Sequence, residues 1–102
     1  MSFRIKYMRQ ALIDLEDIRA ILSRYYKGTK KRFFRLLKDK TSNISEHPHM
    51  CPVYEYDPDY RRMVVGDYLV FYIVDEERKM VEIHRILHGS QNISKVAEDD
   101  KL

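Results

Sequence analysis

The run from Tyr68 to Val74 restricts the fold more than any other feature, because every one of its residues is apolar or aromatic. Its β-branched and aromatic residues favour a strand. Successive residues of a strand point to opposite faces of a sheet, so both faces of this strand carry apolar side chains. The run therefore predicts a central strand that must be covered on both faces.

Two further strand signals flank this run. Residues 63–65 precede it across Gly66-Asp67, a pair suited to a tight hairpin turn. Residues 80–88 follow it across a charged turn at residues 75–79. The two expected faces of this last strand are Val81, Ile83, Arg85 and Leu87 against Glu82, His84, Ile86 and His88. With a short edge strand expected at residues 53–56, these segments predict an antiparallel meander of three or four strands.

The N-terminal half of the chain has a different period. Phe3, Ile5 and Tyr7 alternate with charged residues, which indicates a short strand. From residue 9 to 26, apolar residues recur every three or four positions, as on one side of an amphipathic helix. The expected buried stripe consists of Ala11, Leu12, Leu15, Ile18, Leu22 and Tyr25. Asp14 lies off this stripe.

A second helix is expected after Gly28, which is placed to end the first one. We expect the Thr29 hydroxyl to cap this helix and the His47-Pro48 step to end it. Its expected buried side chains are Phe33, Phe34, Leu37 and Ile44. Two helices with so short a connection predict an antiparallel hairpin. The predicted class is α+β: an N-terminal strand, a helical hairpin on one face of the sheet, and the meander.

Length and composition predict one small domain. The 102 residues are 44% hydrophobic and 34% charged, and we expect a domain at residues 1–97 followed by a polar tail at 98–102. No run approaches the roughly 20 apolar residues that cross a bilayer, and charges interrupt the N-terminus at Arg4 and Lys6. Cys51 is the only cysteine. These features together predict a cytoplasmic protein without contact with a membrane.

No motif of the sequence predicts a cofactor. His47, His49 and Cys51 follow one another at two-residue steps, whereas zinc ligands usually show a wider, paired spacing. We therefore expect neither a cofactor nor a metal.

The two halves of the chain differ in charge. Residues 1–46 hold 12 Lys or Arg and 5 Asp or Glu, and residues 47–102 hold 7 and 11, so net charges of +7 and −4 make up the total of +3. The basic half predicts either contact with nucleic acid or an acidic partner, or only a solvated helix face. The candidate target-binding residues are Lys31, Arg35, Lys38 and Arg61.

Three segments resemble the RelE/ParE family of bacterial toxins from toxin–antitoxin systems. They are Tyr7–Leu15, Arg62–Val74 and Val81–Gly89, and the resemblance extends over about residues 3–93. The resemblance implies a toxin that inhibits growth when free and is neutralised by a cognate antitoxin. It also implies that the toxin forms a homodimer or a heterotetramer with the antitoxin. The family divides into RelE-like enzymes that cut mRNA on the ribosome and ParE-like proteins that poison DNA gyrase.

Cleavage of RNA by its own 2′-hydroxyl needs a base, a cation and an acid. The candidate catalytic residues for this reaction are Glu55, Arg62, Arg85 and His88. RelE-like nucleases usually carry an arginine where this chain has Leu69 and a lysine-rich strand where it has the acidic segment 53–60. Acidic side chains there repel an RNA backbone. We therefore favour a ParE-like, gyrase-directed or non-nucleolytic toxin, with mRNA cleavage and a degenerate non-toxic antitoxin-binding module as alternatives.

The antitoxin is expected on an apolar face of the sheet, either the one that carries the residues named next or its opposite, and an added strand at an open edge is a further mode of binding. The candidate contact residues are Leu69, Phe71 and Ile73. A second face must stay polar, bind something, or need a partner, and the apolar side chains of the central strand favour a partner, because the helices alone cannot cover both faces.

Overall fold

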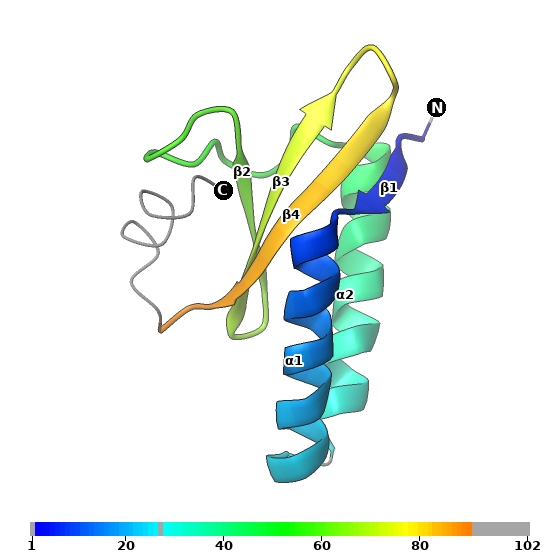
Figure 1. The fold of residues 1–102 in the computed structure, drawn as a ribbon. Helices are drawn as coiled ribbons and strands as arrows, with labels where there is room; N and C mark the ends of the chain where they lie inside the picture. Colours follow the sequence, from blue (N-terminus) through cyan, green and yellow to red (C-terminus); the bar gives the residue numbers. More distant parts are fainter. Residues whose placement is uncertain (1, 27, 91–102) are drawn as a thin grey trace.

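The computed structural model describes residues 2–26 and 28–90, and Figure 1 shows a twisted sheet with a helical hairpin along one side. The elements in chain order are β1 (Arg4–Tyr7), α1 (Arg9–Tyr25), α2 (Thr29–Glu46), β2 (Arg61–Val65), β3 (Tyr68–Asp75) and β4 (Met80–His88). The predicted α+β class and the order of its elements are confirmed. The C-terminal tail at 98–102 lies outside the described residues. Within the described part of the chain, no helix is both long enough and apolar enough to span a bilayer.

The sheet has the strand order β1-β4-β3-β2. Strands β2, β3 and β4 form the predicted antiparallel meander, whereas β1 pairs with the first half of β4 in parallel. The sheet is therefore mixed. The edge strand predicted at residues 53–56 is wrong, because only Val53 forms an isolated bridge, to Arg61. Pro52 and Pro58 bracket this segment, and proline offers no N–H to a strand ladder.

Strand β4 contains a bulge. Phe71 lies opposite Arg85, but the next residue of β3, Tyr72, lies opposite Ile83, so His84 is an extra residue in β4. An extra residue reverses the alternation of the side chains that follow it. Ile86 accordingly packs in the core on the helix side, and Leu87 packs on the other face. The predicted faces of β4 are wrong beyond His84 for this reason.

The hairpin covers one face of the sheet through a narrow stripe. Helix α1 buries Ala11, Asp14, Ile18 and Leu22, while two predicted core residues, Leu12 and Tyr25, are exposed. Helix α2 buries Phe33, Leu37, Thr41 and Ile44. Its N-cap is Gly28 without a side-chain cap, so the predicted cap by Thr29 is wrong, and the Thr29 hydroxyl instead accepts a hydrogen bond from Arg32. The hairpin runs on past the end of the sheet, and Tyr25 lies on this overhang (Figure 1).

Candidate functional site

The face of the sheet away from the helices is largely covered by the chain itself. Tyr54 and Tyr60, from the loop between α2 and β2, pack on Phe71 and Leu87, and Phe71 is 0% exposed. The Tyr54 and Phe71 rings meet edge to face with centroids 4.9 Å apart. Phe71 therefore has no surface to offer a partner, and the expectation that the chain cannot cover this face is wrong at its centre.

An apolar strip remains open beside this cover. Leu69 and Ile73 are half-buried on the same face, and Val64, which pairs with Leu69 from β2, is exposed. These three residues are named the sheet strip below. Leu69 and Ile73 are the part of the predicted antitoxin surface that stays accessible, and Val64 is an addition from the structure.

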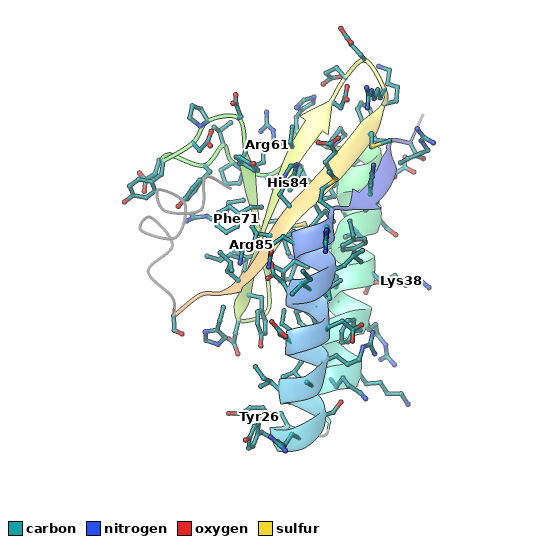
Figure 2. All side chains as sticks on the ribbon, viewed as in Figure 1. Tyr26, Lys38, Arg61, Phe71, His84 and Arg85 are labelled. Atoms are coloured by element: carbon teal, nitrogen blue, oxygen red, sulfur yellow. The ribbon has the colours of Figure 1, made fainter. Side chains whose placement is uncertain are left out.

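A buried carboxylate joins α1 to the free edge of β4. Because β1 pairs with β4 only as far as Ile83, the later residues of β4 face α1. Asp14 Oδ2 accepts hydrogen bonds from Arg85 Nε at 3.0 Å and from the Ile86 backbone N–H at 2.9 Å. Figure 2 shows Arg85 between the strand and this helix. Asp14 thus replaces a strand partner, which corrects its predicted position on the solvated side of the helix.

The four candidate catalytic residues do not come together. Arg85 is held by Asp14. Glu55 is exposed in the loop, and Arg62 is exposed on β2 opposite Phe71, on the face away from the helices. His88 ends β4 on the helix side, where its ring meets Tyr68 edge to face at 5.2 Å. The sheet therefore separates Arg62 from His88.

An acid–base cluster that the sequence did not single out lies on the face away from the helices. His84 Nε2 is 3.3 Å from Glu82 Oε1, and the His84 ring meets the Tyr60 ring edge to face at 5.3 Å. His84 lies on this face because it follows Ile83, which points to the helix side, and the bulge changes the faces only of the residues after it. No signal in the sequence marks the bulge, because His84 fits a regular alternation equally well.

Burial sets the ionisation of the tyrosines on both faces. It raises the pKa of Tyr54, Tyr60 and Tyr72 above the ordinary value of 10.0. Neighbouring carboxylates, Asp57 and Asp59 among them, raise the pKa of Tyr60 further. These hydroxyls are therefore neutral at physiological pH.

The candidate target-binding residues fall into two groups. Lys31, Arg35 and Lys38 are exposed on the side of α2 that faces away from the core. Arg61 instead donates a hydrogen bond to the Cys51 carbonyl at 2.7 Å and a longer one to that of His49. Arg61 therefore serves to hold the loop after α2, which argues against its predicted role in target binding.

A groove of about 970 Å³ lies between the hairpin and the end of the sheet. Apolar side chains from both helices and from β4 form most of its wall, among them Ile21, Leu36 and Ile86. Tyr26 and Arg32 also line it, and Figure 2 shows Tyr26 at the tip of the hairpin. Among the described residues, no group of three His, Cys, Asp or Glu side chains is placed to hold a metal.

Comparison with solved structures identifies the class of this fold as that of toxins from toxin–antitoxin systems. The toxin–antitoxin complex ParDE of Pseudomonas aeruginosa superposes with a TM-score of 0.69 at 15% identity, covering 85% of this chain and 96% of that one. The RelBE2 complex of Mycobacterium tuberculosis gives 0.63 at 19%, covering 86% and 99%. The isolated RelE toxin of Escherichia coli gives 0.64 at 15%, covering 99% and 100%.

Comparison at the level of sequence is more specific. Residues 5–93 match the family described as the ParE toxin of the type II toxin–antitoxin system parDE. The chain belongs to this family, and it is thus the toxin component of a type II system. No protein of curated function matches the sequence.

Proposed function

We propose that this chain is a cytoplasmic ParE-like toxin that arrests growth through DNA gyrase and does not cut RNA. Its membership of the ParE family supports the gyrase branch. The observation that carries the proposal is the separation of the candidate catalytic residues, with Arg85 held by Asp14 at 3.0 Å and Arg62 on the face of the sheet opposite to His88. Acid, base and cation must meet at one phosphate, and these side chains do not.

A growth assay, a gyrase assay and a primer-extension assay on the free toxin test this proposal. Induction of the chain without its antitoxin is expected to stop colony formation. Purified gyrase with supercoiled plasmid is then expected to accumulate cleaved DNA in the presence of the toxin, while primer extension on translated messages finds no new ends. The double variant Glu55→Ala/His88→Ala is expected to keep full toxicity. Loss of toxicity in this variant with its fold intact, or cleavage of messages, would contradict the proposal, and the absence of growth arrest would indicate a degenerate module.

Ribosome-dependent mRNA cleavage is the second candidate, and the contact between His84 and Glu82 at 3.3 Å favours it. Together with the Tyr60 ring, these groups offer a partly buried acid–base pair on the face of the sheet away from the helices. The variant His84→Ala separates the two functions. If the toxin is a nuclease, the variant loses growth arrest and message cleavage together. If the toxin poisons gyrase, the variant keeps its effect on gyrase and its toxicity. Tyr56→Ala is the control on the same side of the molecule.

The antitoxin of this system is proposed to bind the sheet strip. Leu69, Ile73 and Val64 offer adjacent apolar side chains at the uncovered margin of the sheet. A charge introduced there by Leu69→Asp is expected to leave a toxin that its antitoxin no longer neutralises, because a desolvated carboxylate opposes docking. Phe71 is not a suitable probe, because it is buried under Tyr54 and Tyr60 and its replacement would disturb their packing. Full neutralisation of the Leu69→Asp and Val64→Asp variants would place the antitoxin elsewhere.

A further inference from the structure

The helical hairpin concentrates positive charge in residues 18–38, a segment that includes its overhanging tip. Residues 18–38 contain eight Lys or Arg and no Asp or Glu, so the rest of the chain, with a total of +3, has a net charge of −5. The eight are Arg19, Arg24, Lys27, Lys30, Lys31, Arg32, Arg35 and Lys38. The structure describes all of these residues except Lys27, and none of the described ones forms an ion pair with another described residue. Carboxylates of the described residues therefore do not neutralise this charge, and it attracts polyanions.

Two exposed tyrosines lie on the same tip. Tyr25 and Tyr26, at the end of α1, are 65% and 57% exposed. Their ring centroids are 6.4 Å apart at an angle of 61°, so each ring presents its own surface. Neither ring belongs to the two core clusters. Tyrosine side chains normally bury most of their ring, so two open ones in succession form a surface that stability does not require.

Cations lie next to these rings. The Arg24 guanidinium is 5.9 Å from the Tyr25 ring centroid. Tyr26 and Arg32 both line the groove, and Arg32 donates a hydrogen bond to the Thr29 hydroxyl. Figure 2 shows Tyr26 at the far end of the hairpin, away from the sheet.

We propose that this tip binds single-stranded nucleic acid, with bases stacked on Tyr25 and Tyr26 and phosphates held by Arg24 and Arg32. Aromatic rings beside a basic track are the combination that single-strand binders use, because every base offers a face for stacking and every linkage a charge. A duplex hides its base faces and cannot use the rings. An acidic protein can use the cations but gains little from two rings set at an angle. The proposal does not depend on which target the toxin acts upon.

Fluorescence anisotropy with a labelled oligo(dT) of about 20 nucleotides tests the proposal on the full chain, made by cell-free synthesis. Tyr25→Ala and Tyr26→Ala are each expected to weaken binding about tenfold through loss of stacking. Tyr26→Phe, which keeps the ring, is expected to bind as the parent does. Tyr56→Ala is the matched control, because Tyr56 is 56% exposed but lies in the acidic loop.

Salt dependence tests the phosphate contacts separately. Arg24→Gln and Arg32→Gln are each expected to reduce the slope of log affinity against log salt by about 0.7. Arg78→Gln, an exposed arginine in the turn between β3 and β4, is the control and is expected to leave the slope unchanged. All variants alter exposed side chains, and circular dichroism verifies that each one is folded.

Three results would overturn the proposal. The first is no binding of oligo(dT) at low salt. The second is equal affinity of the Tyr25→Ala, Tyr26→Ala and Tyr56→Ala variants. The third is competition by polyglutamate as strong as by unlabelled oligo(dT), which would assign the tip to an acidic protein. None of them bears on gyrase poisoning, which the plasmid assay measures independently.

Discussion

Replacement of Asp14 is expected to destabilise the protein far more than replacement of an exposed acidic residue of the same helix. The side chain is 7% exposed and accepts hydrogen bonds from the Arg85 guanidinium and the Ile86 backbone N–H. Asp14→Ala leaves the guanidinium without this carboxylate and the strand N–H without its acceptor. Because both groups are out of water, the loss exceeds that of a solvated ion pair.

The magnitude follows from these contacts. Removal of one partner of a buried ion pair costs about 3–5 kcal/mol. Asp14→Asn keeps an oxygen that can accept from the Ile86 N–H, so its cost is expected to be lower, about 1–3 kcal/mol. The pair variant Asp14→Leu/Arg85→Met, which removes both charges, is expected to recover most of the stability.

Urea unfolding followed by circular dichroism measures these differences. A loss of about 3 kcal/mol lowers the urea midpoint by about 2 M for a domain of this size. Asp17→Ala is the control, since Asp17 is exposed one turn along the same helix and its replacement is expected to cost under about 0.5 kcal/mol. A cost of less than about 1 kcal/mol for Asp14→Ala would refute the role of this carboxylate as a substitute for a strand partner.

Four other perturbations have defined outcomes in the same assay. Tyr54→Phe is expected to stabilise the protein by about 1 kcal/mol, because the buried Tyr54 hydroxyl has no hydrogen-bond partner among the described residues; a loss of stability would reveal a partner. Tyr72→Phe is expected to cost about 1 kcal/mol, because the Tyr72 hydroxyl donates to the Pro48 carbonyl at 2.9 Å; an unchanged midpoint would contradict this. Burial raises the pKa of Tyr72 above 10.0, so the unfolded state loses this proton at a lower pH than the folded state does. The contribution of Tyr72 to the free energy of unfolding is therefore constant below about pH 10 and falls above it. A urea midpoint that does not fall in the alkaline range would contradict this. Gly66→Ala is expected to cost about 1 kcal/mol, because Gly66 has φ +60° in the β2–β3 turn, and a neutral effect would show that the turn can relax.

Much of the site could not be predicted, because it depends on contacts between distant parts of the chain. Asp14 is separated from Arg85 by 71 residues, and no periodicity of α1 reveals that a strand edge opposite needs an acceptor. The bulge at His84 reversed the faces of Ile86, Leu87 and His88 without any change in residue type. Both features arise when two elements meet, so a pattern within one element carries no sign of them.

At the hairpin, the charge could be predicted from the sequence, but the exposure of the tyrosines could not. Its charge could be read directly, since residues 18–38 lack any acid. The exposure of Tyr25 could not, because its spacing after Leu22 matches a buried stripe. Tyr25 is exposed because the hairpin extends past the end of the sheet, so the last turn of α1 has no surface to pack on.

The pattern of residues along the chain determined the helices and strands, their order, and the need to cover β3 on both faces, because periodicity and side-chain shape act between near neighbours. What covers the second face was decided by tertiary structure. Two tyrosines from a loop close over Phe71, and Leu69, Ile73 and Val64 remain accessible at the margin. A loop carries no period, so its path over the sheet depends on the shape of the surface beneath it and on the hydrogen bonds that hold its backbone.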